Sequence, residues 1–157
     1  MTRINTIDPR LLPMPWLVAE YRELPRILNR TALGKPFLPT PPTYRMGEGH
    51  MSFFGDKLLY LYRRHELLRA ELMRRAGAAS MSCDHAYEQC EQQYPELCND
   101  WEPATADHVV NLTRLYENWH SSKRMYLNDW NAWFSVVRAT HPLPSDVVLQ
   151  LWSEPKC

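Results

Sequence analysis

The chain has 157 residues, of which 45% are hydrophobic and 23% charged, and its 18 basic and 18 acidic residues give no net charge. This length suits one domain with its own apolar core, and the composition is that of a globular rather than a disordered protein. No run approaches the ~20 apolar residues that a membrane-spanning helix needs, and no signal peptide is recognisable, so we expect a cytoplasmic protein without a membrane segment.

The charge is distributed unevenly along the chain. Residues 1–76 contain 13 Lys or Arg and 7 Asp or Glu, whereas residues 77–157 contain 5 and 11. A basic half can present a phosphate-attracting face even when the whole chain is neutral. Ordinary solvated surface gives the same distribution, so charge alone does not establish nucleic-acid binding.

The first elements in chain order are an arm and a helix. Prolines at 9 and 13 predict an extended arm over residues 1–13. Apolar residues at helical spacing predict a helix over residues 15–30, and Pro25 should kink it because proline has no N–H. The expected core-facing residues of this helix are Leu17, Tyr21, Leu24 and Leu28.

A proline-rich connector and a second helix follow. Residues 35–42 read as polyproline-like chain, and residues 47–50 as a turn. The second helix is expected over residues 56–77, with Asp56 as its N-cap and Gly77 at its C-terminal stop. The inner stripe of this helix is predicted to be Leu58, Leu61, His65, Leu68 and Leu72.

The second half begins with an acidic insertion at residues 80–107, with a short helix around 84–93. Apolar periodicity predicts a third long helix over residues 105–121, another helical segment through Val137, and a last short helix at 145–152. No convincing strand pairs occur. We therefore expect a mainly α protein: a single compact helical domain over residues 1–157, with three long helices, short C-terminal helices and no significant sheet.

The four cysteines are more consistent with free thiols than with disulfides or a metal site. Without a signal peptide the reduced state is expected. The intervals between the first three do not match the short spacings of structural zinc sites, so we expect no metal. These residues are Cys83, Cys90, Cys98 and Cys157.

The first helix carries a group of charges on one side. Arg22, Glu23 and Arg26 fall within an arc of about 100° on a helix of 3.6 residues per turn. Two guanidinium groups on one face suit two backbone phosphates. The carboxylate between them fits either an ion-pair partner, which is common at this spacing, or a general acid/base.

Three segments carry a family resemblance. Met1–Asn5 (MTRIN), Ala19–Arg26 (AEYRELPR) and Gly49–Leu58 (GHMSFFGDKL) closely resemble the pyrimidine-dimer DNA glycosylase (phage endonuclease V) family. The resemblance covers roughly the first 75 residues, in the same order and with similar spacing. It implies a DNA glycosylase with AP lyase activity on an all-helical fold, acting on double-stranded DNA.

The same resemblance implies roles for particular residues. The family's nucleophile is the α-amine freed when the initiator methionine is removed, which falls on Thr2, and its catalytic carboxylate falls on Glu23. The family's arginines that contact the DNA backbone fall on Arg3, Arg22 and Arg26. No metal or cofactor and no obligate protein partner is implied, and we expect a monomer.

Elementary chemistry is consistent with these roles. An α-amine titrates near ~7.7–8.0, so an appreciable fraction is neutral and nucleophilic at physiological pH. Attack on C1′ displaces the base and leaves an imine, after which Glu23 can move protons during β-elimination.

Two alternatives stay open from the sequence alone. The chain departs from the family at Pro15-Trp16, where the family has Gln-His, and in its acidic segment. These departures favour a relative that performs a base-hypermodification step on a modified pyrimidine in phage DNA. In the other alternative, the chain is a non-catalytic DNA- or protein-binding module in which Glu23 is only an ion-pair partner.

Overall fold

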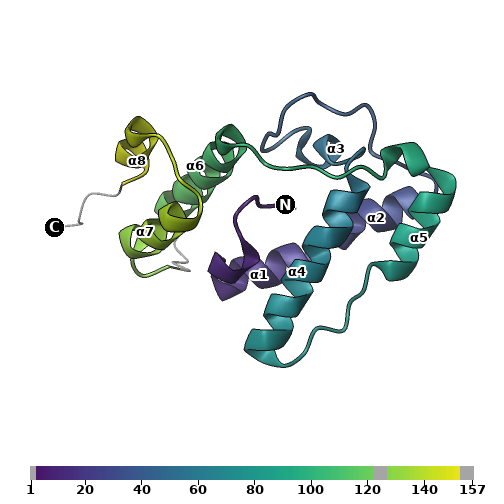
Figure 1. Cartoon of the computed structure of the whole chain (residues 1–157), viewed down its shortest axis with the longest axis horizontal. Helices are drawn as coiled ribbons and strands as arrows, with labels where there is room; N and C mark the ends of the chain where they lie inside the picture. The colour runs from purple at the N-terminus through teal and green to yellow at the C-terminus, as the bar shows by residue number, and fades with distance from the viewer. Residues whose placement is uncertain (1–2, 122–126, 153–157) are drawn as a thin grey trace. The chain divides into compact units, whose positions relative to one another are not determined.

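The computed structural model describes residues 3–121 and 127–152, and they form helices joined by loops (Figure 1). No β-strand occurs among these residues; the only pairing of this kind is an isolated bridge between Lys57 and Cys98. The predicted mainly α class is therefore confirmed. The helices are α1 (Met14–Glu23), α2 (Pro25–Ala32), α3 (His50–Phe53), α4 (Leu58–Ala76), α5 (Asp84–Gln93), α6 (Thr105–Ser121), α7 (Trp130–Thr140) and α8 (Ser145–Leu151), with short 3-10 turns at Pro9–Leu11 and Pro95–Leu97.

The chain divides into two compact units. The first unit comprises Met1–Asn5 and Met14–Glu102, and the second comprises Thr6–Pro13 and Pro103–Cys157. The chain thus passes from one unit to the other directly after Asn5, and returns before the first long helix. Organisation as a single domain over residues 1–157 stays a prediction.

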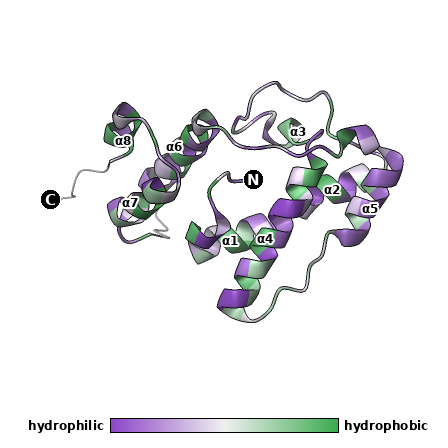
Figure 2. Cartoon of the chain, viewed as in Figure 1, coloured by the Kyte–Doolittle hydropathy of each residue, from purple (hydrophilic) through white to green (hydrophobic). Residues whose placement is uncertain are grey.

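In the first unit α1 packs on α4, and α2 packs on α4 and α5. The predicted inner faces of both long helical segments are confirmed, because every residue expected there is buried. Figure 2 shows that α4 carries hydrophilic and hydrophobic residues side by side along its length, the pattern of a helix with one buried face. The buried residues of these two faces are Leu17, Tyr21, Leu24, Leu28, Leu58, Leu61, His65, Leu68 and Leu72.

Proline 25 breaks the first helical segment in two instead of only kinking it. α1 ends at Glu23 and α2 begins at Pro25, while Leu24 between them keeps α-helical backbone angles. Because Pro25 has no N–H, it cannot donate to the carbonyl oxygen of Tyr21, four residues earlier. The Nε2 of His65 on α4 lies 3.2 Å from that oxygen and supplies the missing donor. The His65 ring also stacks on the Tyr21 ring at 5.0 Å.

Several local predictions hold, and some do not. The helices over 84–93 and 105–121 begin and end as predicted, and Gly77 ends α4 with a φ of 70°. Asp56 is not an N-cap: α4 starts at Leu58, and the Asp56 carboxylate instead pairs with Lys57 Nζ at 2.8 Å. The turn at 47–50 leads into the short helix α3, which periodicity cannot reveal in four residues.

The second unit has an aromatic core. Trp130, Phe134 and Val137 of α7 are buried, and Trp130 Nε1 donates to Leu151 O at 2.7 Å. Residues 6–13 are held inside this unit by polar contacts. Thr6 N donates to Asn111 Oδ1 at 2.8 Å, and Asp8 N donates to His141 Nε2 at 3.1 Å. Trp133 Nε1 donates to Leu11 O at 2.7 Å.

The cysteines within the described residues are free thiols. Burial raises the pKa of Cys83 to about 12 and that of Cys90 to about 11, so both stay protonated at neutral pH. No group of three or more His, Cys, Asp or Glu side chains suited to a metal ion occurs in residues 3–121 and 127–152. Within the same residues, no helix combines the length and hydrophobicity needed to cross a bilayer.

Because His65 is buried, we predict that the free energy of unfolding depends on pH. Burial lowers the pKa of His65 below its ordinary 6.5, so below that pH the unfolded state binds more protons than the folded state. The stabilisation is therefore complete above about pH 6.5 and declines as the pH falls below it.

We expect His65→Phe to lose about 1–3 kcal/mol of stability at pH 7, because the Tyr21 carbonyl loses its donor. Its stability should also fall less steeply between pH 7 and 5. Urea unfolding at several pH values measures both, and parallel pH profiles for the two proteins would contradict this assignment.

Candidate active site

The first unit holds a small hollow at the N-terminal arm, which is defined here as Arg3–Asn5. Its volume is about 90 Å³. The lining residues come from the arm and from one face of α1: Arg3, Asn5, Trp16, Ala19, Glu20 and Glu23. The hollow therefore brings together Arg3 and Glu23, two residues to which the family resemblance assigned roles at one site.

The peptide groups of Ile4 are bound by buried side chains on both sides. Ile4 N donates to His50 Nε2 at 2.8 Å, and Tyr44 Oη donates to Ile4 O at 2.9 Å. His50 Nδ1 lies 2.6 Å from Arg45 O. A carbonyl oxygen only accepts, so Nδ1 carries the proton; Nε2, which receives a proton from Ile4 N, does not. Burial raises the pKa of Tyr44, so its hydroxyl keeps the proton that it donates.

Asn5 is bound by the carboxylate of Glu20. Asn5 N donates to Glu20 Oε1, and Asn5 Nδ2 donates to Glu20 Oε2, both at 3.0 Å. Arg64 of α4 donates to the same two oxygens, with Nε to Oε1 at 2.7 Å and Nη2 to Oε2 at 3.0 Å. Burial alone would lower the pKa of Arg64, but the charge of Glu20 and its hydrogen bonds outweigh burial and raise it. The Glu20 carboxylate thus receives four hydrogen bonds from two residues.

Glu23 and Arg26 lie on either side of the break between α1 and α2. Arg26 Nη1 is 2.7 Å from Glu23 Oε2, and their side chains are 63% and 28% exposed respectively. Arg22, the preceding residue, is exposed. Both carboxylates line the hollow, but Glu23 has access to solvent, whereas the side chain of Glu20 is 0% exposed.

One family model matches the chain, over residues 1–85 of 157, and it describes pyrimidine dimer DNA glycosylases. The match covers more than half of the chain. The chain belongs to the pyrimidine dimer DNA glycosylase family. Membership supports a glycosylase role on a DNA substrate, and every residue that lines the hollow lies in the matched segment.

The structure locates most of the residues that the family resemblance singled out. Arg3 and Glu23 line one hollow, and Arg22 and Arg26 are exposed beside Glu23. Thr2 lies outside the described residues. The sequence reading did not single out the buried polar residues around the arm. These are Asn5, Glu20, Tyr44, His50 and Arg64.

A signal for part of this set is present in the sequence. Glu20 is three residues before Glu23, on the same side of a helix whose neighbouring positions Leu17 and Leu24 face the core. A carboxylate at an inner position requires a buried cationic partner. Only the fold identifies that partner as Arg64, 44 residues away.

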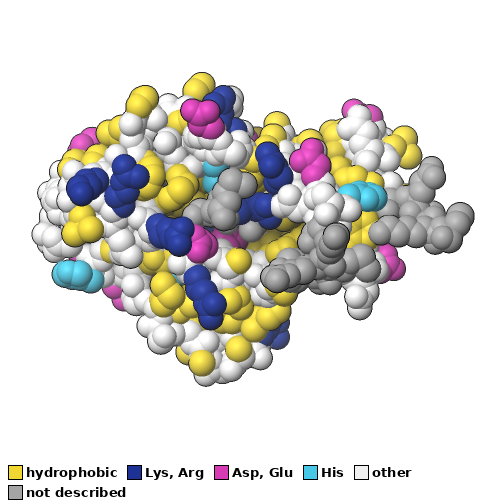
Figure 3. Space-filling view, turned by 180° about the vertical axis from the view of Figure 1, so that it is seen from behind, with side chains coloured by type: hydrophobic (Ala, Val, Ile, Leu, Met, Phe, Trp, Pro, Cys, Tyr) yellow, Lys and Arg dark blue, Asp and Glu magenta, His cyan; other side chains and the backbone are white. Residues whose placement is uncertain are grey.

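Basic side chains are exposed on the side of the molecule that Figure 3 shows. In Figure 3, Lys and Arg side chains in dark blue lie in the left half and the centre of the view, with acidic side chains in magenta among them. Such a mixture lets a face attract phosphate groups while the chain as a whole stays neutral.

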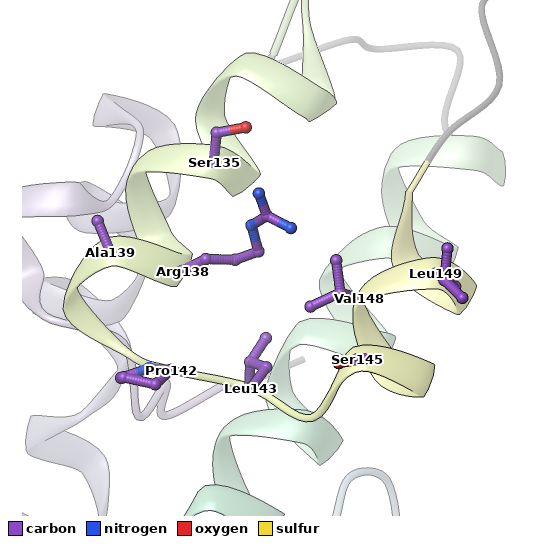
Figure 4. A pocket seen from close by; sticks show the side chains of 8 residues that line it. All are labelled: Ser135, Arg138, Ala139, Pro142, Leu143, Ser145, Val148 and Leu149. Atoms are coloured by element: carbon purple, nitrogen blue, oxygen red, sulfur yellow. The ribbon is translucent and has the colours of Figure 1, made fainter.

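A larger hollow occurs in the second unit, between α7 and α8, with a volume of about 690 Å³. Its walls are mainly apolar, and Arg138 extends into it from α7 (Figure 4). The lining contains no carboxylate, histidine or cysteine, and its hydroxyls are those of Ser135 and Ser145. This hollow therefore lacks the groups for acid/base or imine chemistry and lies outside the segment that the family model matches.

We predict that substitution of the two carboxylates of α1 lowers stability by very different amounts. We expect Glu20→Ala to cost about 3–5 kcal/mol, because it leaves the Arg64 charge buried without its partner. Glu23→Ala should cost less than about 1 kcal/mol, because its ion pair with Arg26 is partly exposed. Denaturant unfolding of the two variants checks this difference, and equal losses would contradict the contrast in their environments.

Proposed function

We propose that this protein excises pyrimidine dimers, or a closely related pyrimidine lesion, from double-stranded DNA, and then cleaves the strand as an AP lyase. The observation that carries the proposal is the hollow in which Arg3 and Glu23 meet, within the segment that matches the family. Thr2 directly precedes Arg3 in the sequence. Removal of Met1 would therefore leave Thr2 with a free α-amine, directly before Arg3, which lines the hollow.

The proposed first step is attack by the neutral Thr2 amine on C1′ of the damaged nucleotide. A C1′–N bond to the enzyme forms, the bond between C1′ and the base breaks, and the base leaves with the bonding electrons. The added amine then loses its protons while the C1′–O4′ bond breaks and O4′ is protonated, which opens the sugar ring and gives an imine between C1′ and the enzyme. Because an α-amine has a pKa near ~7.7–8.0, it needs less activation than a lysine side chain near ~10.4.

Glu23 is proposed to move the protons of the later steps. Imine formation acidifies the C2′ proton; its removal expels the 3′ phosphate by breaking the C3′–O bond, and water then hydrolyses the imine and frees the amine. The partial exposure of Glu23 suits this role, because a carboxylate that exchanges protons needs an oxygen accessible to the substrate.

Arg3, Arg22 and Arg26 are proposed to bind backbone phosphates around the lesion. Arg22 and Arg26 are exposed at the end of α1 and the start of α2, and Arg3 is half-buried at the hollow. Arginine binds phosphate with directed hydrogen bonds and fixes the register of a protein on DNA. Extraction of a nucleotide from the stack costs less at a lesion whose pairing is already weakened.

A second candidate, action on a modified pyrimidine, is favoured by one observation. Trp16, which departs from the family pattern, lines the hollow together with Glu23. An indole ring can stack on an extruded base and so contribute to the choice of substrate. A comparison of dimer-containing duplex with duplex that carries a modified pyrimidine separates the two candidates.

Borohydride trapping tests the imine mechanism. We expect protein whose mass shows that Met1 is removed to form a covalent adduct with dimer-containing and abasic duplex, since borohydride reduces an imine to a stable amine. Protein that retains Met1 serves as the control and should form none. DNA binding by the processed protein without any adduct would overturn the imine mechanism.

Substitution of the proposed acid/base tests its role. We expect Glu23→Gln to bind dimer DNA but to cleave it about 10²–10⁴-fold more slowly, because the amide cannot transfer protons. Glu71→Gln is the control, since Glu71 also pairs with arginines but lies on α4 away from the hollow. Cleavage by Glu23→Gln at the wild-type rate would leave Glu23 as an ion-pair partner only.

The salt dependence of binding tests the proposed phosphate contacts. We expect Arg26→Ala to weaken DNA binding and to reduce the slope of log K against log salt by about 0.9, the contribution of one phosphate contact. The matched control is Arg74→Ala: Arg74 is 69% exposed and pairs with Glu71 three residues away, as Arg26 pairs with Glu23. Equal slopes for the two variants would remove Arg26 from the DNA-binding face.

A further inference from the structure

The N-terminal arm is bound at two consecutive residues by side chains from three parts of the first unit. His50 of α3 and Tyr44 of the connector bind the two peptide groups of Ile4, and Glu20 of α1 binds Asn5. Arg64 of α4 binds Glu20 in turn. These groups are buried, so hydrogen bonds to the protein replace hydrogen bonds to water.

This arrangement exceeds what anchoring of a chain end requires. A terminal segment is usually held by apolar contacts, and Ile4 already supplies such a contact, because it is fully buried. A buried ion pair such as Glu20–Arg64 contributes little net stability compared with apolar side chains of the same size. Its distinctive effect is geometric: a carboxylate with four directed hydrogen bonds holds its two oxygens, and thus Asn5, in one orientation.

Glu20 and Glu23 are on the same helix, three residues apart, so they lie on one side of α1 with an axial separation of about 4.5 Å. Both line the hollow. The carboxylate that holds the arm is thus attached to the same rigid element as the carboxylate that would exchange protons. A shift of α1 moves both groups together and keeps the arm in register with Glu23.

We propose that Glu20, Arg64, Asn5 and His50 are positioning residues, which fix the arm so that the amine of residue 2 meets its target beside Glu23. This role rests on the proposed function. In this role the four residues act through the arm and not on the substrate itself. Misplacement of reacting groups by about 1 Å lowers the rate about 10²-fold. A more mobile arm should therefore slow imine formation without lowering the affinity for DNA.

The choice of variants separates positioning from folding. Asn5→Ala removes the side-chain hydrogen bond to Glu20 and leaves the backbone one, and His50→Leu removes the acceptor for Ile4 N. His50→Gln restores an acceptor oxygen at a similar reach. Glu71→Gln is the control for a general effect on folding, because Glu71 is a buried residue with arginine partners and does not line the hollow.

The experiment combines two measurements on processed protein. Hydrogen exchange of the Ile4 and Asn5 amides reports how firmly the arm is held, and borohydride trapping at saturating abasic DNA reports imine formation apart from binding. We expect Asn5→Ala and His50→Leu to exchange these amides faster and to trap about 10–100-fold more slowly, with DNA affinity within about threefold of wild type. His50→Gln and Glu71→Gln should trap within about threefold of wild type.

The outcomes distinguish the two proposals. Wild-type trapping rates in variants whose arm amides have lost protection would overturn the positioning role and leave the proposed function intact. Equal losses in the variants and in Glu71→Gln would show a general effect on folding and would also overturn it. Absence of trapping in the wild-type protein would overturn the proposed function, and the positioning role with it.

Discussion

The arrangement of the candidate site depends on one buried carboxylate. Glu20 is fully enclosed and receives hydrogen bonds from Arg64 and from both the backbone and the side chain of Asn5. A charge in that position is tolerated only because these donors replace its hydration, so the three residues form one unit that is costly to disrupt. Since they belong to the arm, to α1 and to α4, the same carboxylate sets the relative placement of all three. Glu23 is also on α1, so the same contacts fix its position relative to the arm and to α4.

A second constraint acts at the C-terminal end of α1. Pro25 removes a backbone donor, and His65 replaces it at the Tyr21 carbonyl. Arg64 and His65 are adjacent on α4, and each donates a hydrogen bond to a buried acceptor of α1: Arg64 to the Glu20 carboxylate and His65 to the Tyr21 carbonyl. The helix therefore ends where it does at little cost in hydrogen bonds. That ending puts Glu23 on the last turn of α1 and Arg26 on the first turn of α2, where they pair.

The sequence predicted what depends on local periodicity and failed where distant residues decide. The predicted bounds of α5 and α6 and the predicted inner faces of α1 and α4 are confirmed. A helix that buries one face carries apolar residues at helical spacing, which its own sequence shows. The N-cap at Asp56 was wrong because Lys57, next to it, binds the carboxylate that would have capped the helix. The buried contacts around the arm could not be predicted, since His50 is 46 residues from its partner Ile4, and Arg64 is 44 residues from its partner Glu20. Family resemblance, rather than periodicity, pointed to Arg3 and Glu23, which the fold brings to one hollow.

The environments of Glu20 and Glu23 show why two similar carboxylates on one helix suit different tasks. Glu20 has both oxygens occupied by guanidinium or amide donors, so it suits the task of holding Asn5 and Arg64 in place. Glu23 pairs with Arg26, whose guanidinium is largely exposed, and under the proposed function that guanidinium can turn to a phosphate when DNA is present. Binding of the backbone would then release the Glu23 oxygen that the ion pair occupies in the free protein. On this view the ion pair and the proposed acid/base role of Glu23 are compatible. The ion pair with Arg26 describes the free protein, and the acid/base role would begin when a DNA phosphate binds Arg26 in its place.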